Sequence, residues 1–212
     1  KMKVDTIRIF SRNEANQIKM ESELKDDRLR FFVGDVRDYP RLVRALEDVD
    51  IVFHAAALKH VPVVEYNPFE AIKSNVIGSQ NVIDACLYEN VEKAIAIGTD
   101  KAVSPLNTYG ATKLLMEKLF VSANNYVNPE KHRTKFMSVR YGNVFGSSGS
   151  IGNALVCFKH RGIAAIGPIP CELVCLICRF ALSDGLGERF MPRVGQNGHW
   201  SLLLVISWNE RR

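Results

Sequence analysis

Residues 93–113 read KAIAIGTDKAVSPLNTYGATK, and this stretch indicates the fold class. The apolar run at 93–97 is typical of a buried strand, and apolar residues at helical spacing predict a long helix over 106–126. Another strand is predicted at 135–141. A strand, a helix and a second strand in this order are typical of a parallel sheet covered by helices.

The same alternation extends toward the N-terminus. Asn67, Pro68 and Glu70 resemble a capped helix start, in which Asn67 caps the helix and proline occupies the first helical position. Further strands are predicted at 4–10, 29–33 and 51–57, and further helices at 14–24, 40–49 and 67–87. The sequence therefore predicts an α/β fold with a doubly wound parallel sheet, of the Rossmann-like, NAD(P)-binding kind.

A dinucleotide-binding fold ordinarily starts with a strand and a glycine-rich turn that holds the pyrophosphate. Here the first strand, at 4–10, has the features of a second strand, so we expect the first βα unit to be absent. Residues 155–212 lose the regular alternation and contain four of the five cysteines. We therefore predict an NADP-binding domain at 1–154 and a divergent remnant of a substrate-binding region at 155–212. The unfilled first-strand position predicts a marginally stable chain with weak NADP binding.

Composition excludes several function classes. The chain has 28 Lys and Arg against 23 Asp and Glu, but the basic residues form no long block, so nucleic-acid binding is not expected. No apolar run approaches the length of a membrane span, and no signal peptide is recognisable. Cys171, Cys175 and Cys178 are spaced like metal ligands but lack a fourth ligand, so we expect no metal site. These features favour a cytoplasmic protein with reduced thiols.

The predicted helix at 106–126 carries the strongest chemical signal. Tyr109 and Lys113 lie four residues apart and therefore on one helical face. A nearby ammonium group favours the phenolate form of a tyrosine, which can then exchange a proton with a substrate hydroxyl. Thr99, Asp100 and Lys101 follow the strand at 93–97, at the sheet edge where ligands bind in doubly wound folds. Asp100 and Lys101 offer an acid and a base in one site.

The cofactor preference follows from the end of the first strand. Folds that prefer NAD place an acidic residue there to bind the ribose 2′-hydroxyl. Ser11 and Arg12 occupy this position here, and an arginine suits a 2′-phosphate. The sequence therefore predicts NADP as cofactor.

Together these motifs resemble the UDP-N-acetylglucosamine 4,6-dehydratase (inverting) family of the extended short-chain dehydrogenases, which act in bacterial polysaccharide biosynthesis. The resemblance covers residues 4–154. It rests on Thr99–Ala102, Tyr109 with Lys113, Ser11–Glu14, Gly34–Asp38, His54–Pro62, Asn67–Pro68, Asn75 with Gly78, and Arg140–Ser147.

The resemblance implies a role for each catalytic residue. The sugar would be oxidised at C4 by NADP, with Tyr109 taking the hydroxyl proton, Thr99 bonding the same hydroxyl and Lys113 positioning the nicotinamide ribose. Lys101 would remove the C5 proton while Asp100 protonates the departing C6 hydroxyl. Hydride would then return to C6, so that the cofactor is regenerated.

The resemblance also implies a set of binding residues. Asp35 and Val36 would flank the adenine, and the turn of Ala55, Ala56 and Ala57 would pass the cofactor phosphates or ribose. Lys59 would lie near the nicotinamide and the substrate, and Asn143 would help to hold the UDP-sugar. A homo-oligomer is expected for the full-length form.

Two alternatives stay open. A UDP-sugar 4-epimerase shares the Tyr–Lys–Thr set, although epimerisation needs no acid–base pair for the loss of water, so Asp100 and Lys101 argue against it. A truncated, non-catalytic remnant of either enzyme is favoured by the missing glycine turn and the divergent tail.

Overall fold

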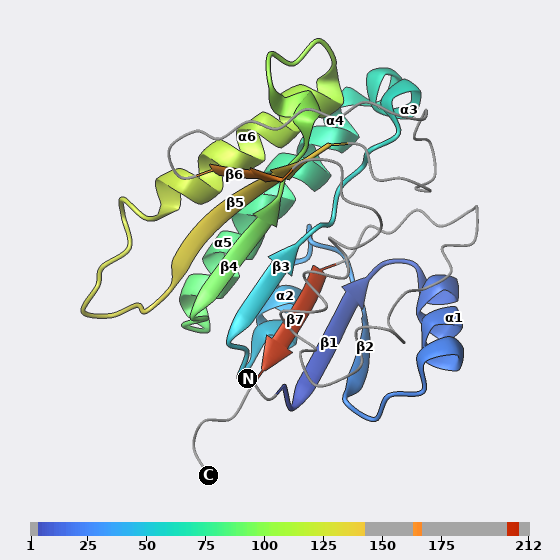
Figure 1. Ribbon diagram of the computed structural model, residues 1–212, viewed down its shortest axis with the longest axis vertical. Coiled ribbons are helices and arrows are strands. Elements are labelled where there is room, and N and C mark those ends of the chain that lie inside the picture. Colours follow the sequence, from blue (N-terminus) through green and yellow to red (C-terminus); the bar gives the residue numbers. More distant parts are fainter. Residues whose placement is uncertain (1–3, 143–162, 167–202, 208–212) are drawn as a thin grey trace.

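A computed structural model describes residues 4–142, 163–166 and 203–207 (Figure 1). The strands form one seven-stranded sheet in the order β2-β1-β7-β3-β4-β5-β6. They are β1 (Thr6–Ser11), β2 (Leu29–Val33), β3 (Ile51–His54), β4 (Lys93–Ile97), β5 (Lys135–Tyr141), β6 (Ile163–Ile166) and β7 (Leu203–Ser207). The helices are α1 (Glu14–Leu24), α2 (Tyr39–Leu46), α3 (Val61–Tyr66), α4 (Pro68–Ala71), η1 (Ile72–Ile77), α5 (Gly78–Tyr88), η2 (Asp100–Ala102) and α6 (Thr108–Ala123).

Six of the seven strands run parallel, which confirms the predicted α/β fold. β1 pairs with β2, and β3, β4, β5 and β6 pair in sequence, all in parallel register. β7 runs antiparallel to both β1 and β3, so those two strands share one direction. The carboxyl ends of β1, β3, β4 and β5 therefore meet at one edge of the sheet, where doubly wound folds bind ligands.

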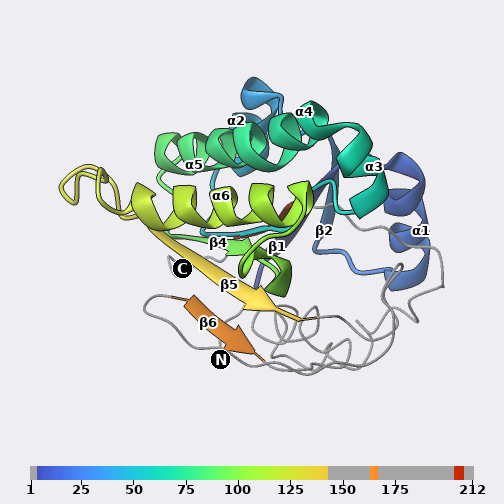
Figure 2. The same ribbon diagram turned by 90° about the horizontal axis from the view of Figure 1, so that it is seen from above.

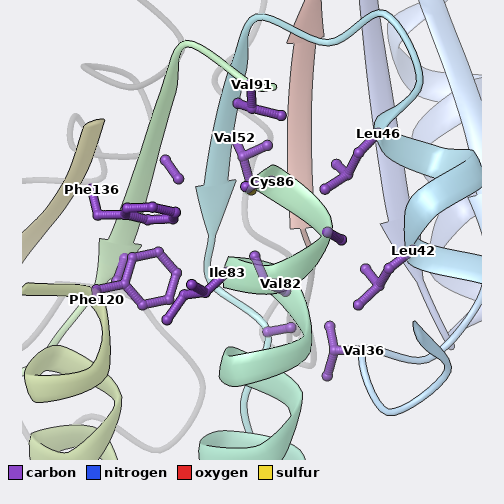
Figure 3. Close-up of a cluster of buried hydrophobic side chains, with 14 of the residues drawn as sticks. Val36, Leu42, Leu46, Val52, Val82, Ile83, Cys86, Val91, Phe120 and Phe136 are labelled. Atoms are coloured by element: carbon purple, nitrogen blue, oxygen red, sulfur yellow. The ribbon is translucent and has the colours of Figure 1, made fainter. Parts of the chain in front are cut away.

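Alternation along the strands divides the buried side chains between two faces. Phe10 and Val52 belong to the larger cluster, which α2, α5 and α6 cover (Figures 2 and 3). Ile9 and Phe53, their neighbours in sequence, belong to the smaller cluster, against which side chains of α1 pack. Successive strand residues point to opposite faces, so these short apolar strands contribute to both cores.

The predicted helix at 67–87 is the largest departure from expectation. It is interrupted by η1, a π-helix, and is preceded by α3, which the sequence analysis missed. Asn67 does not cap α4 as predicted, because its side-chain amide donates to the carbonyl of Val63 instead. Glu70 makes ion pairs with Arg37 and Lys73, rather than completing a capping box. π-Helical turns inside helices often occur at functional sites.

The expected gap beside β1 is filled, so the prediction of unpaired edges there is wrong. β7 occupies the position of the first strand in the 3-2-1-4-5-6 order, pairing Ile206 with both Ile7 and Ile51. A strand with neighbours on both sides satisfies the backbone groups that would otherwise cost stability. The predicted boundary at residue 154 and the cysteine cluster at 157–178 lie outside the described residues. β6 and β7, which follow that boundary, join the same sheet.

In the described part of the chain, no helix is both long enough and apolar enough to cross a membrane. Cys86 is a buried free cysteine, and burial raises the pKa of its thiol. This cysteine is therefore inert and packs as a small apolar side chain.

The central position of β7 predicts a large effect of a proline there. Val205→Pro removes a backbone donor from a strand paired on both sides and leaves a neighbouring backbone group unpaired, at a cost of about 1–3 kcal/mol. The melting temperature should fall by roughly 2–12 °C. Val205→Ile, which keeps the backbone donor and the β-branch, is the matched control in thermal melts followed by circular dichroism. Equal melting temperatures for the proline variant and the unaltered chain would contradict the pairing.

Candidate functional site

A hollow lies at the carboxyl ends of β1 and β3. Its lining includes six of the residues predicted to bind the cofactor: Ser11, Arg12, Asp35, Val36, Ala56 and Ala57. Phe10 and Ser74 also line it and were missed by the sequence analysis, since neither carries a charge or lies in the nucleotide-binding motifs. Ser74 lies in η1, so the π-helix contributes directly to this hollow.

Of the other predicted binding residues, Ala55 and Lys59 are not among those that line this hollow. Ala55 packs against the smaller core cluster. Lys59 is partly buried, and burial together with the charge of Lys101 lowers its pKa. Lys59 and Lys101 therefore lie close enough to interact, although they are 42 residues apart in sequence. Asn143 lies outside the described residues.

Thr99, Asp100 and Lys101 form a compact hydrogen-bonded turn after β4. Thr99 Oγ1 donates to Asp100 Oδ1 over 2.9 Å, and the backbone N–H of Lys101 donates to the same oxygen over 2.9 Å. Lys101 Nζ lies 3.2 Å from that oxygen, with both side chains about two-fifths exposed. A carboxylate and an ammonium group thus lie in contact where a ligand can reach both of them.

Helix α6 is packed closely against this turn. Asn107 caps the helix by accepting a hydrogen bond from the backbone of Gly110 over 2.7 Å. A side chain at Gly110 would collide with the carbonyl oxygen of Lys101, so only glycine allows the approach. Tyr109 is 8% exposed, and Thr99 lies close enough to lower the pKa of its phenol. The structure therefore brings Tyr109 together with the turn that carries Asp100 and Lys101.

The expected effect of Lys113 on Tyr109 is corrected by the structure. Burial raises the pKa of the Tyr109 phenol, the nearby Tyr141 and Asp100 raise it further, and the hydrogen bond with Thr99 opposes these effects. Lys113 Nζ instead donates to the sulfur of Met116 over 3.2 Å. Desolvation therefore dominates over the ammonium charge, and the neutral phenol is the favoured form in this structure.

Lys113 is itself deeply buried, at 3% exposure. Burial lowers its pKa to about 8, although the negative charge of Glu117 acts in the opposite direction. Glu117 lies one helical turn further along α6 and is also buried. A buried ammonium with a lowered pKa beside a buried tyrosine is typical of functional sites.

Glu117, the partner of Arg140, was not predicted from the sequence. Arg140 Nε lies 3.0 Å and 2.8 Å from the two oxygens of Glu117, and Arg140 Nη2 lies 2.6 Å from Oε2. A side chain at Gly98, the residue after β4, would collide with the Glu117 carboxylate. Only glycine therefore lets the backbone lie this close to the ion pair. The pair links α6 to β5 just behind the turn at 99–101. In the sequence, the one indication of this ion pair is the position of Arg140 in a motif that resembles the family.

Asn75 in η1 connects two further parts of the site. Its side chain accepts from the backbone of Leu58 over 2.7 Å and donates to the carbonyl of Leu58 over 2.9 Å. It also donates to Thr112 Oγ1 over 3.0 Å. The loop that carries Lys59 is thereby held against the helix that carries Tyr109 and Lys113. Within the described ranges, no group of histidine, cysteine, aspartate and glutamate side chains could hold a metal ion.

The burial of Lys113 predicts a pH-dependent stability. The pKa is about 8 in the folded chain, against 10.5 ordinarily, so the unfolded chain binds the proton more tightly between these values. Stability therefore rises with pH across this window, and burial of the charge costs about 3 kcal/mol below it. Lys113→Met should raise the free energy of unfolding by about this amount near pH 7, and by less than half of it near pH 9.5.

Urea denaturation at the two pH values measures this difference. Lys118→Met, an exposed lysine on the same helix, is the control and should change stability little at either pH. A gain from Lys113→Met that is equal at both pH values would show that packing, not the buried charge, is responsible.

Three known proteins resemble this chain in sequence, and two of them are named as sugar-nucleotide enzymes. An uncharacterized membrane protein of Methanocaldococcus jannaschii is 58% identical over 146 residues, 69% of this chain and 43% of that protein. A UDP-N-acetylglucosamine 4,6-dehydratase (inverting) of Campylobacter jejuni is 55% identical over 149 residues, 70% of this chain and 44% of the enzyme. A UDP-glucose 4-epimerase of Rickettsia bellii is 47% identical over 148 residues, 70% of this chain and 43% of the enzyme. The chain thus spans less than half the length of these relatives.

Solved structures agree with the fold. Pen from Bacillus thuringiensis matches with a TM-score of 0.66 and 46% identity, over 69% of this chain and 45% of Pen. MoeE5, solved in complex with UDP-glucose and NAD, matches with a TM-score of 0.51 and 26% identity, over 56% of this chain and 42% of MoeE5.

The family model described as polysaccharide biosynthesis protein matches residues 1–182, which is most of the chain. The match includes all of the predicted catalytic residues, in the turn after β4 and on α6, and the residues that line the hollow. The chain belongs to the polysaccharide biosynthesis protein family of Rossmann-fold sugar-nucleotide dehydratases and epimerases.

Proposed function

We propose that this chain is the cofactor-binding and catalytic part of an NADP-dependent 4,6-dehydratase that acts on UDP-N-acetylglucosamine. The observation that carries this proposal is the contact of 3.2 Å between Asp100 and Lys101, in the turn whose first residue, Thr99, lies near Tyr109. Dehydration needs an acid and a base in addition to the group that takes the C4 hydroxyl proton. The dehydratase of Campylobacter jejuni, at 55% identity, supports the same assignment.

Each residue has a task in this proposal. Tyr109 accepts the proton of the C4 hydroxyl, and Thr99 holds that hydroxyl in place. When bound, NADP supplies a hydride acceptor for C4 and a hydride donor for C6. Lys101 removes the C5 proton, which a C4 ketone makes acidic, and Asp100 protonates the departing C6 hydroxyl, which leaves as water. A proton returns to C5 when hydride adds to C6. Lys113 positions the nicotinamide ribose, and Lys59 and Asn143 contact the substrate.

The lining of the hollow fits an adenosine that carries a 2′-phosphate. Arg12 offers a charged donor and Ser11 a hydroxyl at its rim, and Val36 and Ala56 supply apolar surface for a base. A planar guanidinium matches the geometry of a phosphate. Because MoeE5 was solved with NAD, a nicotinamide cofactor is supported at the level of the fold family, and the preference for NADP rests on Arg12.

A UDP-sugar 4-epimerase is the second candidate, favoured by the identity of 47% to the epimerase of Rickettsia bellii. A non-catalytic part of either enzyme is the third. A cytoplasmic location and a homo-oligomer of the full-length form stay predictions from the sequence. Incubation with UDP-N-acetylglucosamine and NADP, analysed by NMR, separates the candidates. A 4-keto-6-deoxy sugar indicates the dehydratase, a C4 epimer the epimerase, and nucleotide binding without turnover the third.

Two substitutions test the catalytic roles. Lys101→Ala should lower dehydration by at least about 100-fold, because general base catalysis typically contributes that much, and should leave NADP affinity unchanged. Tyr109→Phe should block the first oxidation, so that no reduced cofactor forms even transiently in stopped-flow absorbance. A Lys101→Ala variant that forms product at a rate near that of the unaltered enzyme would remove Lys101 as the C5 base.

A further substitution tests the cofactor preference. Arg12→Ala should weaken NADP by roughly 1.5–3 kcal/mol, because a hydrogen bond between charged groups is lost, and should weaken NAD much less. Calorimetric titration with both cofactors measures the difference. Equal weakening of NAD and NADP binding would show that Arg12 does not contact the 2′-phosphate.

A further inference from the structure

A chain of alternating charges runs from the rim of the hollow to η1. Arg12 contacts Asp35, Asp35 contacts Arg37, Arg37 contacts Glu70, and Glu70 contacts Lys73. Three cations and two carboxylates give this group a net charge of +1. One positive charge is therefore not balanced by a carboxylate within this group.

The carboxylate of Asp35 is shared unequally between its two cations. Arg37 donates to Asp35 Oδ2 from Nη2 over 2.7 Å and from Nε over 3.0 Å, and its backbone N–H donates to Oδ1 over 3.0 Å. The contact from Arg12 is longer, with 3.3 Å between Nη1 and Oδ2. Arg37 is thus the principal partner of Asp35, and Arg12, at 47% exposure, is the more weakly held cation.

The placement of these residues decides which cation an anion in the hollow meets. Arg12 and Asp35 line the hollow, whereas Arg37 is not among its lining residues. Glu70 Oε2 lies 3.0 Å from Arg37 Nη1 and thereby holds the far side of that guanidinium. Partial burial acts to raise the pKa of Asp35, but the hydrogen bonds and charges of Arg37 and Arg12 outweigh it, so the pKa is lowered and the carboxylate stays ionised.

An ionised Asp35 has two consequences for a phosphate at this rim. It attracts Arg12 toward itself, and its own charge repels the phosphate. Arg37 opposes both effects, because it neutralises Asp35 from outside the hollow. We propose that Arg37 is a positioning residue that sets the selectivity of this hollow for a 2′-phosphate, by engaging Asp35 so that Arg12 remains available to the anion. This rests on the proposed nucleotide site and adds to it a determinant that touches no ligand.

The test uses the chain itself and two small probes, 2′,5′-ADP and 5′-AMP. Their affinities are measured by NMR titration, and selectivity is the ratio of the two dissociation constants. The unaltered chain should prefer 2′,5′-ADP. Arg37→Gln should lower this selectivity about two- to five-fold, the range expected for a partly exposed ion pair. Arg44→Gln, an exposed arginine of α2, removes the same net charge and should leave the selectivity unchanged.

A double substitution separates the proposed route from others. In an Asp35→Asn background there is no carboxylate for Arg37 to neutralise, so adding Arg37→Gln should leave the selectivity unaltered. Arg37→Lys, which keeps the charge without the bidentate geometry, should restore part of the selectivity lost in Arg37→Gln.

Three results would overturn the inference alone: an unchanged selectivity in Arg37→Gln, an equal loss in Arg44→Gln, or a loss that persists in the Asp35→Asn background. The last would mean that Arg37 contacts the phosphate directly. If the unaltered chain binds neither probe, or binds both equally, the proposed NADP site fails, and this inference fails with it.

Discussion

The pairing of one strand with both β1 and β3 is the constraint on which the rest of the structure depends. The hollow lies at the ends of these two strands, since Phe10 and Ser11 end β1 and Ala56 and Ala57 follow β3. β7 pairs antiparallel with both strands, so they share one direction. The antiparallel direction of β7 does not disturb this, since hydrogen bonding across a sheet is possible in either direction. Its carboxyl end lies at the opposite edge of the sheet.

The part of the site that carries Tyr109 depends on a second constraint, the close approach of α6 to the turn after β4. Gly98 and Gly110 remove the side chains that would prevent it. The ion pair of Glu117 and Arg140 then fixes α6 to β5, with Glu117 almost fully buried. Breaking such a pair by removing one partner typically costs about 3–5 kcal/mol, because an uncompensated charge stays buried. The position of Tyr109 beside Thr99 is therefore determined by packing as well as by sequence spacing.

Much of the fold could be predicted from short-range patterns, and the failures have physical causes. The strands at 29–33, 93–97 and 135–141 and the helix at 14–24 match the prediction, because their apolar runs are clear and their ends are marked by polar residues. The pairing of β7 could not be predicted, since its partners are separated from it by about 150 residues or more. The capping role of Asn67 failed because α3, an unexpected helix, supplies a competing carbonyl at Val63. Six of the residues predicted to bind the cofactor line one hollow, whereas the pKa of Tyr109 could not be inferred, because spacing does not reveal burial.

The two ends of the site differ in burial, and their charged groups therefore behave differently. At the rim of the hollow the charged groups are partly exposed, so their pairing is weak and can be redistributed when an anion arrives. Around Tyr109 and Lys113 burial raises one pKa and lowers the other, so that both groups are driven toward their neutral forms. A phenolate there needs a positive charge close by, and Lys113 Nζ is directed at Met116 instead. A ligand that displaced Lys113 from Met116, or that placed a positively charged ring beside Tyr109, would favour the phenolate. This attraction is the opposite of the Coulomb repulsion by which Asp100 disfavours the phenolate. In the proposed mechanism, proton acceptance at Tyr109 would therefore depend on a bound ligand that supplies this positive charge.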